Sequence, residues 1–214
     1  MTGPPFKISV GALVLGAGAS SRMGQPKLVL PWRSTTILGQ ILETCLSVGM
    51  AQIAVVCAPP PHAVSTELDR LRIPAAHRIV NPQPAAGMFS SIQCAARWPN
   101  WEAGLTHFMI LLGDQPQISR DTLLSLMRHA ENNPGKLIQP AIGGKAKHPI
   151  LLPTARFIQL GSTPHLTLRD FLLNRGPDRS FLEVNDPSVA VDLDSPADYA
   201  AALARFGSNE GRDL

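Results

Sequence analysis

The chain alternates short apolar runs with segments in which apolar residues recur at helical spacing. The apolar runs predict strands over residues 8–15, 52–57, 76–80, 107–112, 137–141, 148–152, 180–184 and 189–193. Spacing of three and four predicts helices over residues 36–48, 65–71, 119–131 and 166–173, one that opens at Ser90 and stops before Pro99, and a last one that starts at Ser195-Pro196. The run 107–112 does not alternate with polar residues, which is typical of a strand covered on both faces.

The ends of several predicted helices carry recognisable capping residues. Ser90 with Gln93 three positions later forms a capping-box pattern, Ser119 precedes another helix, and Ser195 is followed by Pro196 at the first helical position. Strand-helix alternation favours one doubly wound, mostly parallel sheet with helices on both faces. We expect a single domain over residues 1–206 and a frayed tail over 207–214.

Composition and charge narrow the class of protein. Of the 214 residues, 44% are hydrophobic and 16% are charged, which indicates an ordered globular chain. The net charge of +3 is carried by scattered basic residues, so the sequence does not favour a nucleic-acid partner. Three cysteines without close spacing predict neither a disulfide framework nor a CxxC metal site. The first apolar segment is too short to span a membrane, and we expect a soluble, cytoplasmic protein.

A glycine-containing loop follows the first strand. Gly16 and Gly18 would let the backbone approach a ligand closely, and Arg22 and Lys27 add two cations to the same loop. Glycine turns after strands are common, but the two cations favour a polyphosphate site. A P-loop is excluded by the spacing of its glycines and by Gln25 where a lysine is required. A Rossmann dinucleotide site is disfavoured because Ser21 replaces its third glycine and the second strand ends without an acidic residue.

Acidic residues follow two other strands. Asp114 lies between Gly113 and Gln115-Pro116, after the strand over residues 107–112, where it could bind Mg²⁺ or could simply form a turn. Asp192 and Asp194 alternate at the end of a late strand and would share one face, although Asp194 could also serve the start of the last helix. Because ligands bind beyond the carboxyl ends of parallel strands, we expect the cations and carboxylates to meet in one crevice.

Five segments together resemble the molybdopterin nucleotidyltransferase-like family. The first is residues 15–28, which are similar to the signature LAAGxSxRMGxxKL. The others are NPQPAAGMFSS (81–91), LGDQP (112–116), His148-Pro149 and DLDSPADY (192–199), in the same order as the family's later motifs. The resemblance spans almost the whole chain and implies a Rossmann-like nucleotidyltransferase fold. The GMxxS element at 87–91 and Ala17, where guanylyl-transferring members carry a glycine, make the chain most similar to the cytidylyl-transferring members.

The resemblance also implies roles for individual residues. Arg22 and Lys27 would hold the triphosphate and, with Asp114, carry catalysis; Asp114 would bind Mg²⁺ with Asp192 or Asp194 as second ligand; His148 would lie on the acceptor side. The nucleotide would be bordered by Leu15, Gly16, Ala17, Gly18, Asn81, Gly87 and Ser91. Three positions depart from the family pattern: Gly16 replaces an alanine, Pro84 replaces an aromatic residue, and Lys147 replaces the glycine before His148.

The activity that the resemblance implies is transfer of CMP from CTP to the terminal phosphate of molybdenum cofactor (molybdopterin), with release of pyrophosphate. Both reactants are anions, so charge neutralisation and positioning would supply most of the catalysis. The alternatives are transfer of GMP or another nucleotide, a different phosphorylated acceptor, or a non-catalytic chaperone that hands a cofactor to a molybdoenzyme client. Retention of Arg22, Lys27, Asp114 and the late aspartates favours an enzyme over a non-catalytic module.

Overall fold

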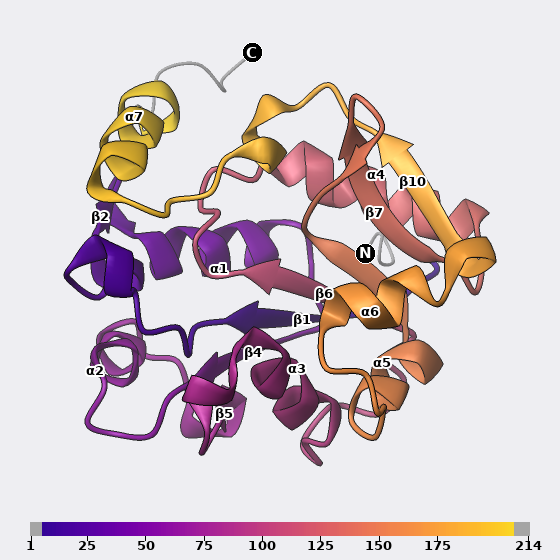
Figure 1. Ribbon diagram of the computed structural model, residues 1–214, viewed down its shortest axis with the longest axis horizontal. Helices are drawn as coiled ribbons and strands as arrows, with labels where there is room; N and C mark the ends of the chain where they lie inside the picture. Colours follow the sequence, from indigo (N-terminus) through magenta and orange to yellow (C-terminus); the bar gives the residue numbers. More distant parts are fainter. Residues whose placement is uncertain (1–5, 208–214) are drawn as a thin grey trace, which may run out of the picture.

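The computed structural model describes residues 6–207, which form one central sheet with helices on both faces (Figure 1). The strands are β1 (Val10–Leu15), β2 (Pro31–Trp32), β3 (Thr35–Thr36), β4 (Gln52–Cys57), β5 (Arg78–Val80), β6 (His107–Leu112), β7 (Leu137–Ile142), β8 (Lys145–Ala146), β9 (Ile150–Pro153) and β10 (Arg179–Glu183). The α-helices are α1 (Ile37–Ser47), α2 (Ala63–Arg70), α3 (Met88–Ala96), α4 (Arg120–Asn132), α5 (Thr154–Leu160), α6 (Leu168–Leu173) and α7 (Pro196–Phe206).

The order of the strands in the sheet is β10-β7-β9-β6-β1-β4-β5, with β8 paired to β7. Strand β1 is parallel to both neighbours, β4 and β6, and all six of its residues are buried. Strand β9 is antiparallel to β6 and to β7, so the predicted mostly parallel, doubly wound sheet is confirmed with β9 and the short β8 as its antiparallel members. Burial on both faces explains why β1 and β6 are apolar without alternation.

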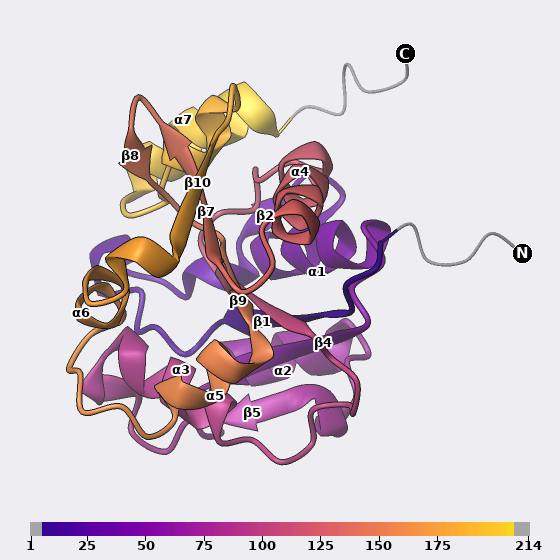
Figure 2. The same cartoon turned by 90° about the vertical axis from the view of Figure 1, so that its right-hand side faces the viewer.

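Two hydrophobic clusters lie between the sheet and the helices on its two faces. One cluster packs α1, α2 and α4 against one face of the sheet and includes residues of α7, and the other packs α3, α5 and α6 against the opposite face (Figure 2). Successive residues of β1 divide between the clusters, since Ala12 and Val14 belong to the first and Leu13 and Leu15 to the second. The alternation of side chains along a strand therefore ties both layers to the strand that leads into the glycine loop.

Most predicted helix starts agree with the structure, but the one at Ser90 is wrong. Helix α3 begins at Met88 after Gly87, whose φ of 94° suits a glycine, and no side chain caps it. The Ser90 hydroxyl instead donates to the Gly87 carbonyl oxygen at 2.7 Å. By contrast, Ser119 caps α4, and Ser195 with Asp198 forms a complete capping box at the start of α7.

The predicted strand over residues 189–193 is also wrong. A 3₁₀ helix, Pro187–Ala190, occupies its first half, and the rest of the segment pairs with no strand. The side-chain amide of Gln117 donates to the carbonyl oxygens of Ser188 and Val191 at 3.2 and 2.6 Å and thus takes the place of a neighbouring strand. Burial of Val189 and Leu193 produced the alternation that resembles a strand.

The apolar pattern did not lead us to predict the hairpin β2–β3 or the short helix α5. Apart from Gly207, the predicted tail lies outside the described residues. Within residues 6–207, every helix is too short or too polar to cross a lipid bilayer.

Candidate active site

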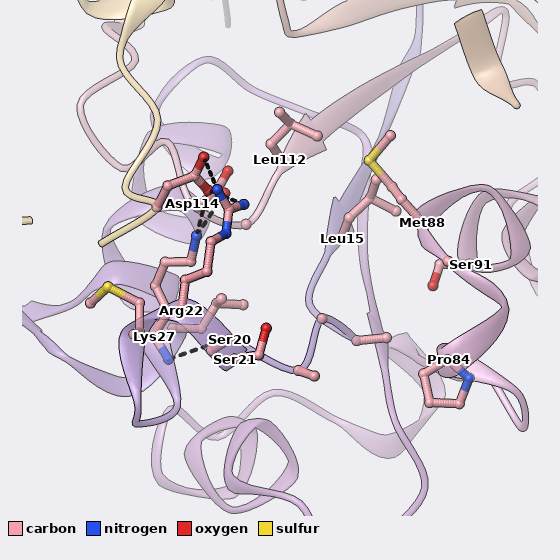
Figure 3. Close-up of a pocket in the computed structure, with 18 residues that line it drawn as sticks. Leu15, Ser20, Ser21, Arg22, Lys27, Pro84, Met88, Ser91, Leu112 and Asp114 are labelled. Carbon is pink, nitrogen blue, oxygen red and sulfur yellow. Dashed lines mark hydrogen bonds and ion pairs between the residues drawn. The ribbon is translucent and has the colours of Figure 1, made fainter. Parts of the chain in front are cut away.

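A cleft of about 430 Å³ opens at the carboxyl ends of β1 and β6. Its walls come from the glycine loop after β1, the start of α3, the turn after β6 and the segment before α7 (Figure 3). The residues that line it are Leu15, Ala17, Gly18, Ala19, Ser20, Ser21, Arg22, Met23, Lys27, Leu28, Pro84, Gly87, Met88, Ser91, Leu112, Gly113, Asp114 and Asp194. This position agrees with the rule that ligands bind beyond the carboxyl ends of parallel strands.

The glycine loop is fixed to the sheet at its start and closed on itself at its end. The Gly16 amide donates to the Val56 carbonyl oxygen of β4 at 2.8 Å, and Gly16 itself lies behind the cleft rather than in its lining. The loop then turns through Ser20, whose φ is 51°, and the Ser20 hydroxyl oxygen accepts from the Lys27 amide at 3.1 Å. The loop thus brings Arg22 and Lys27 to the same wall.

Four charged side chains meet on this wall. The Lys27 ammonium lies 2.8 Å from an Asp114 carboxylate oxygen and 3.7 Å from an Asp194 carboxylate oxygen. The Arg22 guanidinium donates to both oxygens of Asp194, each at 2.9 Å. The Lys27 side chain is only 10% exposed, whereas that of Arg22 is 72% exposed, so the inner pair is shielded from solvent and the outer pair is not. The predicted meeting of the cationic loop and the carboxylates in one crevice is confirmed for these four residues.

The backbone before Asp114 requires a glycine. A Cβ atom at Gly113 would lie 2.2 Å from the Leu15 carbonyl oxygen, which is backbone and cannot move aside without displacing β1. The absence of a side chain at Gly113 lets the turn after β6 pass against the end of β1. This close approach sets Asp114 beside Lys27, which follows β1.

The wall opposite the charges is formed by α3 and the turn before it. Ser91, Gly87 and Pro84 line it, and Met88 projects there with an exposed fraction of 48%. Asn81 is buried behind this wall, where its side-chain amide donates to the hydroxyls of Ser90 and Ser91 at 2.8 and 3.0 Å. Asn81 therefore supports Ser91 and is not itself a lining residue.

Besides Gly16 and Asn81, two more predicted site residues, Asp192 and His148, lie outside the lining of the cleft. Asp192 accepts a hydrogen bond from the Gln115 side-chain amide at 2.8 Å, and of the two late aspartates Asp194 is the one in the cleft. The Nδ1 atom of His148 is buried and has no hydrogen-bond partner. Burial lowers the pKa of His148 to about 4, although the charge of Asp114 acts in the opposite direction. His148 is therefore neutral at neutral pH.

Sequence reasoning did not identify several cleft residues. No binding role was predicted for Met88, Ser20, Leu28 or Leu112, although all four line the cleft. The signal that could have found Ser20 is its position between Gly18 and Lys27, because a serine there can close the loop by accepting from a backbone amide. Gln115 could have been found from its place beside Asp114, but its partner Asp192 is 77 residues away.

The donor set fits a hard cation. Asp114 and Asp194 both present carboxylate oxygens within 4 Å of one ammonium group, so a cation in place of that ammonium would reach both. In the part of the chain that the structure describes, no three side chains of His, Cys, Asp or Glu form a ready-made metal site. Mg²⁺ is usually bound by one or two carboxylates, and water and phosphate oxygens supply its remaining ligands.

Comparisons with known proteins give two relatives that cover most of the chain. The molybdenum cofactor cytidylyltransferase of Escherichia coli (strain K12) is 27% identical over 92% of this chain and 97% of the relative. The nicotine blue oxidoreductase of Paenarthrobacter nicotinovorans is also 27% identical, over 87% of this chain and 92% of the relative.

A solved structure and a family model also match this chain. A nucleotidyl transferase from Methanothermobacter thermautotroptrophicus is 21% identical and has the same fold, with a TM-score of 0.76 over 92% of this chain and 97% of that chain. The model of the MobA-like NTP transferase domain matches residues 12–180, which include the glycine loop and Asp114. The chain therefore belongs to the MobA-like NTP transferase family and is an enzyme of the nucleotidyltransferase class.

Proposed function

We propose that this enzyme transfers CMP from CTP to the terminal phosphate of molybdenum cofactor and releases pyrophosphate, with Mg²⁺ as its metal ion. The observation that carries the proposal is the convergence of Lys27, Arg22, Asp114 and Asp194 on one wall of a cleft at the ends of β1 and β6. Two cations and two carboxylates in one cleft are what a triphosphate and a divalent cation together require.

The cationic side of the cleft would bind the triphosphate. Lys27 is held by its backbone and by burial, so its ammonium is a fixed charge that would lie beside the α-phosphate as negative charge builds there. Arg22 is exposed, so its ion pair with Asp194 would cost little to break, and its planar guanidinium suits the β- and γ-phosphate oxygens. Backbone amides of the loop from Ala17 to Ser21 would add further donors to phosphate.

Asp114 and Asp194 would hold the metal ion. When bound, Mg²⁺ would supply positive charge at the phosphate oxygens and help to orient them. Asp192 would not take part directly, because its carboxylate is turned to Gln115, and its hydrogen bond would fix the turn that carries Asp114.

The transfer itself needs little from side-chain acids and bases. An oxygen of the acceptor's terminal phosphate forms a bond to the α-phosphorus, the bond from that phosphorus to the bridging oxygen breaks, and the electron pair leaves with pyrophosphate. The attacking phosphate oxygen is already ionised near neutral pH, since the second pKa of a phosphate monoester is about 6. The chain's residues would therefore act by positioning the reactants and by offsetting charge.

Two features support cytosine over guanine. Ala17 lines the cleft with a side chain where guanylyl-transferring members carry a glycine, so the space for the base is narrower. The Escherichia coli relative, which this chain matches over 97% of that relative's length, is named for cytidylyl transfer.

The name of the oxidoreductase relative makes a redox role the second candidate to be tested. The cleft offers little support for it, because β4 ends in Cys57, which is buried, and carries no acidic residue for the ribose of a nicotinamide nucleotide. A guanylyl transferase would use the same cleft with GTP in place of CTP. A non-catalytic carrier would bind nucleotide in the same cleft without releasing pyrophosphate.

The experiment is to incubate the full chain with Mg²⁺, molybdenum cofactor and each nucleoside triphosphate in turn, and to measure pyrophosphate. We expect release with CTP. Turnover with GTP but not CTP would overturn the assignment of cytosine as the base. Binding of nucleotide without release of pyrophosphate would favour the non-catalytic carrier, and oxidation of NADH or NADPH would favour the redox role. The variant Asp114→Asn should lose about 10²- to 10³-fold in turnover. Its control is Glu43→Gln, which changes an exposed carboxylate on α1.

A further inference from the structure

The strand order places a third loop at the site beside the two already described. The glycine loop follows β1 and Asp114 follows β6, which is the neighbour of β1. The next strand, β9, is antiparallel to β6, so its first end lies at the same edge of the sheet. In this register Ile150 faces Ile110 in the last pair of the ladder, so the segment that leads into β9 reaches the edge of the sheet at which β6 ends. The charge of Asp114 acts on His148, which agrees with this placement.

The chemistry of the reaction needs a group at this third position. In phosphoryl-group chemistry the attacking and leaving oxygens lie roughly in line on opposite sides of the phosphorus. If pyrophosphate leaves toward Arg22 and Lys27, the acceptor approaches from the side of Asp114 that faces away from the glycine loop. In the sheet, that side is β9 and the residues before it.

The cleft has no spare positive charge for a second anion. Lys27 is paired with Asp114 and Asp194, and Arg22 is paired with Asp194. Even when these partners change on binding, both cations would be engaged by the triphosphate. An acceptor that carries its own phosphate therefore requires a cation from elsewhere.

Lys147 is a cation in the segment that leads into β9. Its backbone amide donates to the Pro140 carbonyl oxygen at 2.8 Å, and its carbonyl oxygen accepts from the Gln139 side chain at 3.2 Å, so its main chain is anchored on β7. Its side chain is partly buried and, among residues 6–207, pairs with no carboxylate. A half-buried lysine without a carboxylate partner, in a segment that reaches the same edge of the sheet as the cleft, is suited to bind an anion from solution.

The part of the sequence that contains Lys147 is also basic. The segment 136–179, which runs from just before β7 to the first residue of β10, carries seven lysines and arginines against two aspartates, whereas the rest of the chain is net negative. A negatively charged acceptor would be drawn to this part of the molecule.

We propose that Lys147, in the segment between β8 and β9 and next to His148, binds the phosphate of the acceptor and so helps to select phosphorylated acceptors. The proposal rests on the proposed function for the direction of transfer. It assigns to this chain a cation at a position where the family pattern has a glycine, and Lys147 would be a binding residue rather than one that acts on the α-phosphate.

The test compares Lys147→Met, Lys147→Arg and the matched control Lys145→Met, which removes an exposed lysine two positions away in the same hairpin. With CTP, Mg²⁺ and molybdenum cofactor, we expect Lys147→Met to raise the KM for the cofactor by about tenfold or more and to leave the KM for CTP within about twofold, as loss of one charge-assisted hydrogen bond predicts. Lys147→Arg should recover most of the loss, Lys145→Met should behave like the wild type, and all should melt at similar temperatures.

Several results would overturn the proposal. These are an unchanged cofactor KM in Lys147→Met, an equal rise in the KM for CTP, or the same effect in Lys145→Met. If the wild type turns over no nucleotide with molybdenum cofactor, the proposed function fails separately. The subsite is then judged with inorganic phosphate as probe, by phosphorus NMR titration of the CTP-bound wild type and Lys147→Met. Weaker phosphate binding in the variant would support the subsite, and equal binding would overturn it.

Discussion

Replacing Lys27 by methionine tests the charged wall directly. Methionine keeps much of the length of the buried stem but removes the ammonium that lies 2.8 Å from Asp114 and 3.7 Å from Asp194. The two carboxylates then face each other without the cation that they share, and only Asp194 retains a partner, Arg22.

The size of the effect follows from how far each group is buried. Removing one partner of a fully buried ion pair costs about 3–5 kcal/mol. The Asp114 and Asp194 side chains are 24% and 39% exposed, so solvent would screen part of that cost. We expect Lys27→Met to lower the free energy of unfolding by about 1–2 kcal/mol. For a chain of this length, that corresponds to a fall in Tm of about 2–8 °C.

The same substitution should change how the protein responds to Mg²⁺ alone. In the wild type the Lys27 ammonium occupies the space between the two carboxylates, so a cation must compete with it. In Lys27→Met that competitor is gone, and Mg²⁺ should raise the Tm of the variant more than that of the wild type, because a ligand that binds only the folded state stabilises it. Turnover should nevertheless fall by about 10²- to 10³-fold.

The assay is thermal unfolding of the wild type, Lys27→Met and the control Lys145→Met, each with and without Mg²⁺ and no nucleotide. An equal Mg²⁺-induced shift in the wild type and in Lys27→Met would refute the idea that Lys27 and the metal share the same carboxylates. A variant as stable as the wild type without Mg²⁺ would show that the ion pairs contribute nothing to folding.

Three further predictions concern the surrounding residues. Gly113→Ala should unfold more easily and lose turnover, since its Cβ would meet the backbone of β1, whereas Gly176→Ala, which has open space around it, should match the wild type in both assays. Arg22→Met should cost less than about 1 kcal/mol of stability in denaturant titration, because its pair with Asp194 is exposed, yet should raise the KM for CTP by about tenfold. The folded-state pKa of His148 is lowered, so stability that is present above pH 6.5 should be lost as the pH falls toward 4. In the same denaturant titration, His148→Gln should lose less free energy of unfolding between pH 7 and pH 5 than the wild type does.

Much of the sheet could be predicted because its strands are buried on both faces. A run such as 107–112 has no amphipathic alternative, and the observed β6 has the predicted bounds, His107–Leu112. The start of α3 could not be predicted from Ser90, since the positive φ of Gly87 ends the preceding turn three residues earlier. The strand predicted over 189–193 failed because a side chain, that of Gln117, satisfies the backbone there.

The site was predicted in its chemistry but not in its pairing. That Arg22, Lys27 and Asp114 would share a crevice followed from the rule for strand ends. The same rule could not tell which late aspartate would join them, because Asp192 and Asp194 would be equivalent in a strand. They differ because this segment of the chain is irregular. The contact of Arg22 with Asp194 spans 172 residues, and no local pattern encodes it.

The pairing suggests why the proposed reaction would need nucleotide and metal together. A triphosphate that entered alone would draw Arg22 and Lys27 away from Asp194 and Asp114 and leave two carboxylates beside its own negative charge. A metal ion that entered alone would take the carboxylates and leave two cations next to it. When both enter, the cations turn to the phosphates and the carboxylates to the metal, and each charge keeps an opposite partner. The ion pairs of the empty cleft would then oppose binding of either ligand by itself and oppose their joint binding much less, which favours the complex in which transfer occurs.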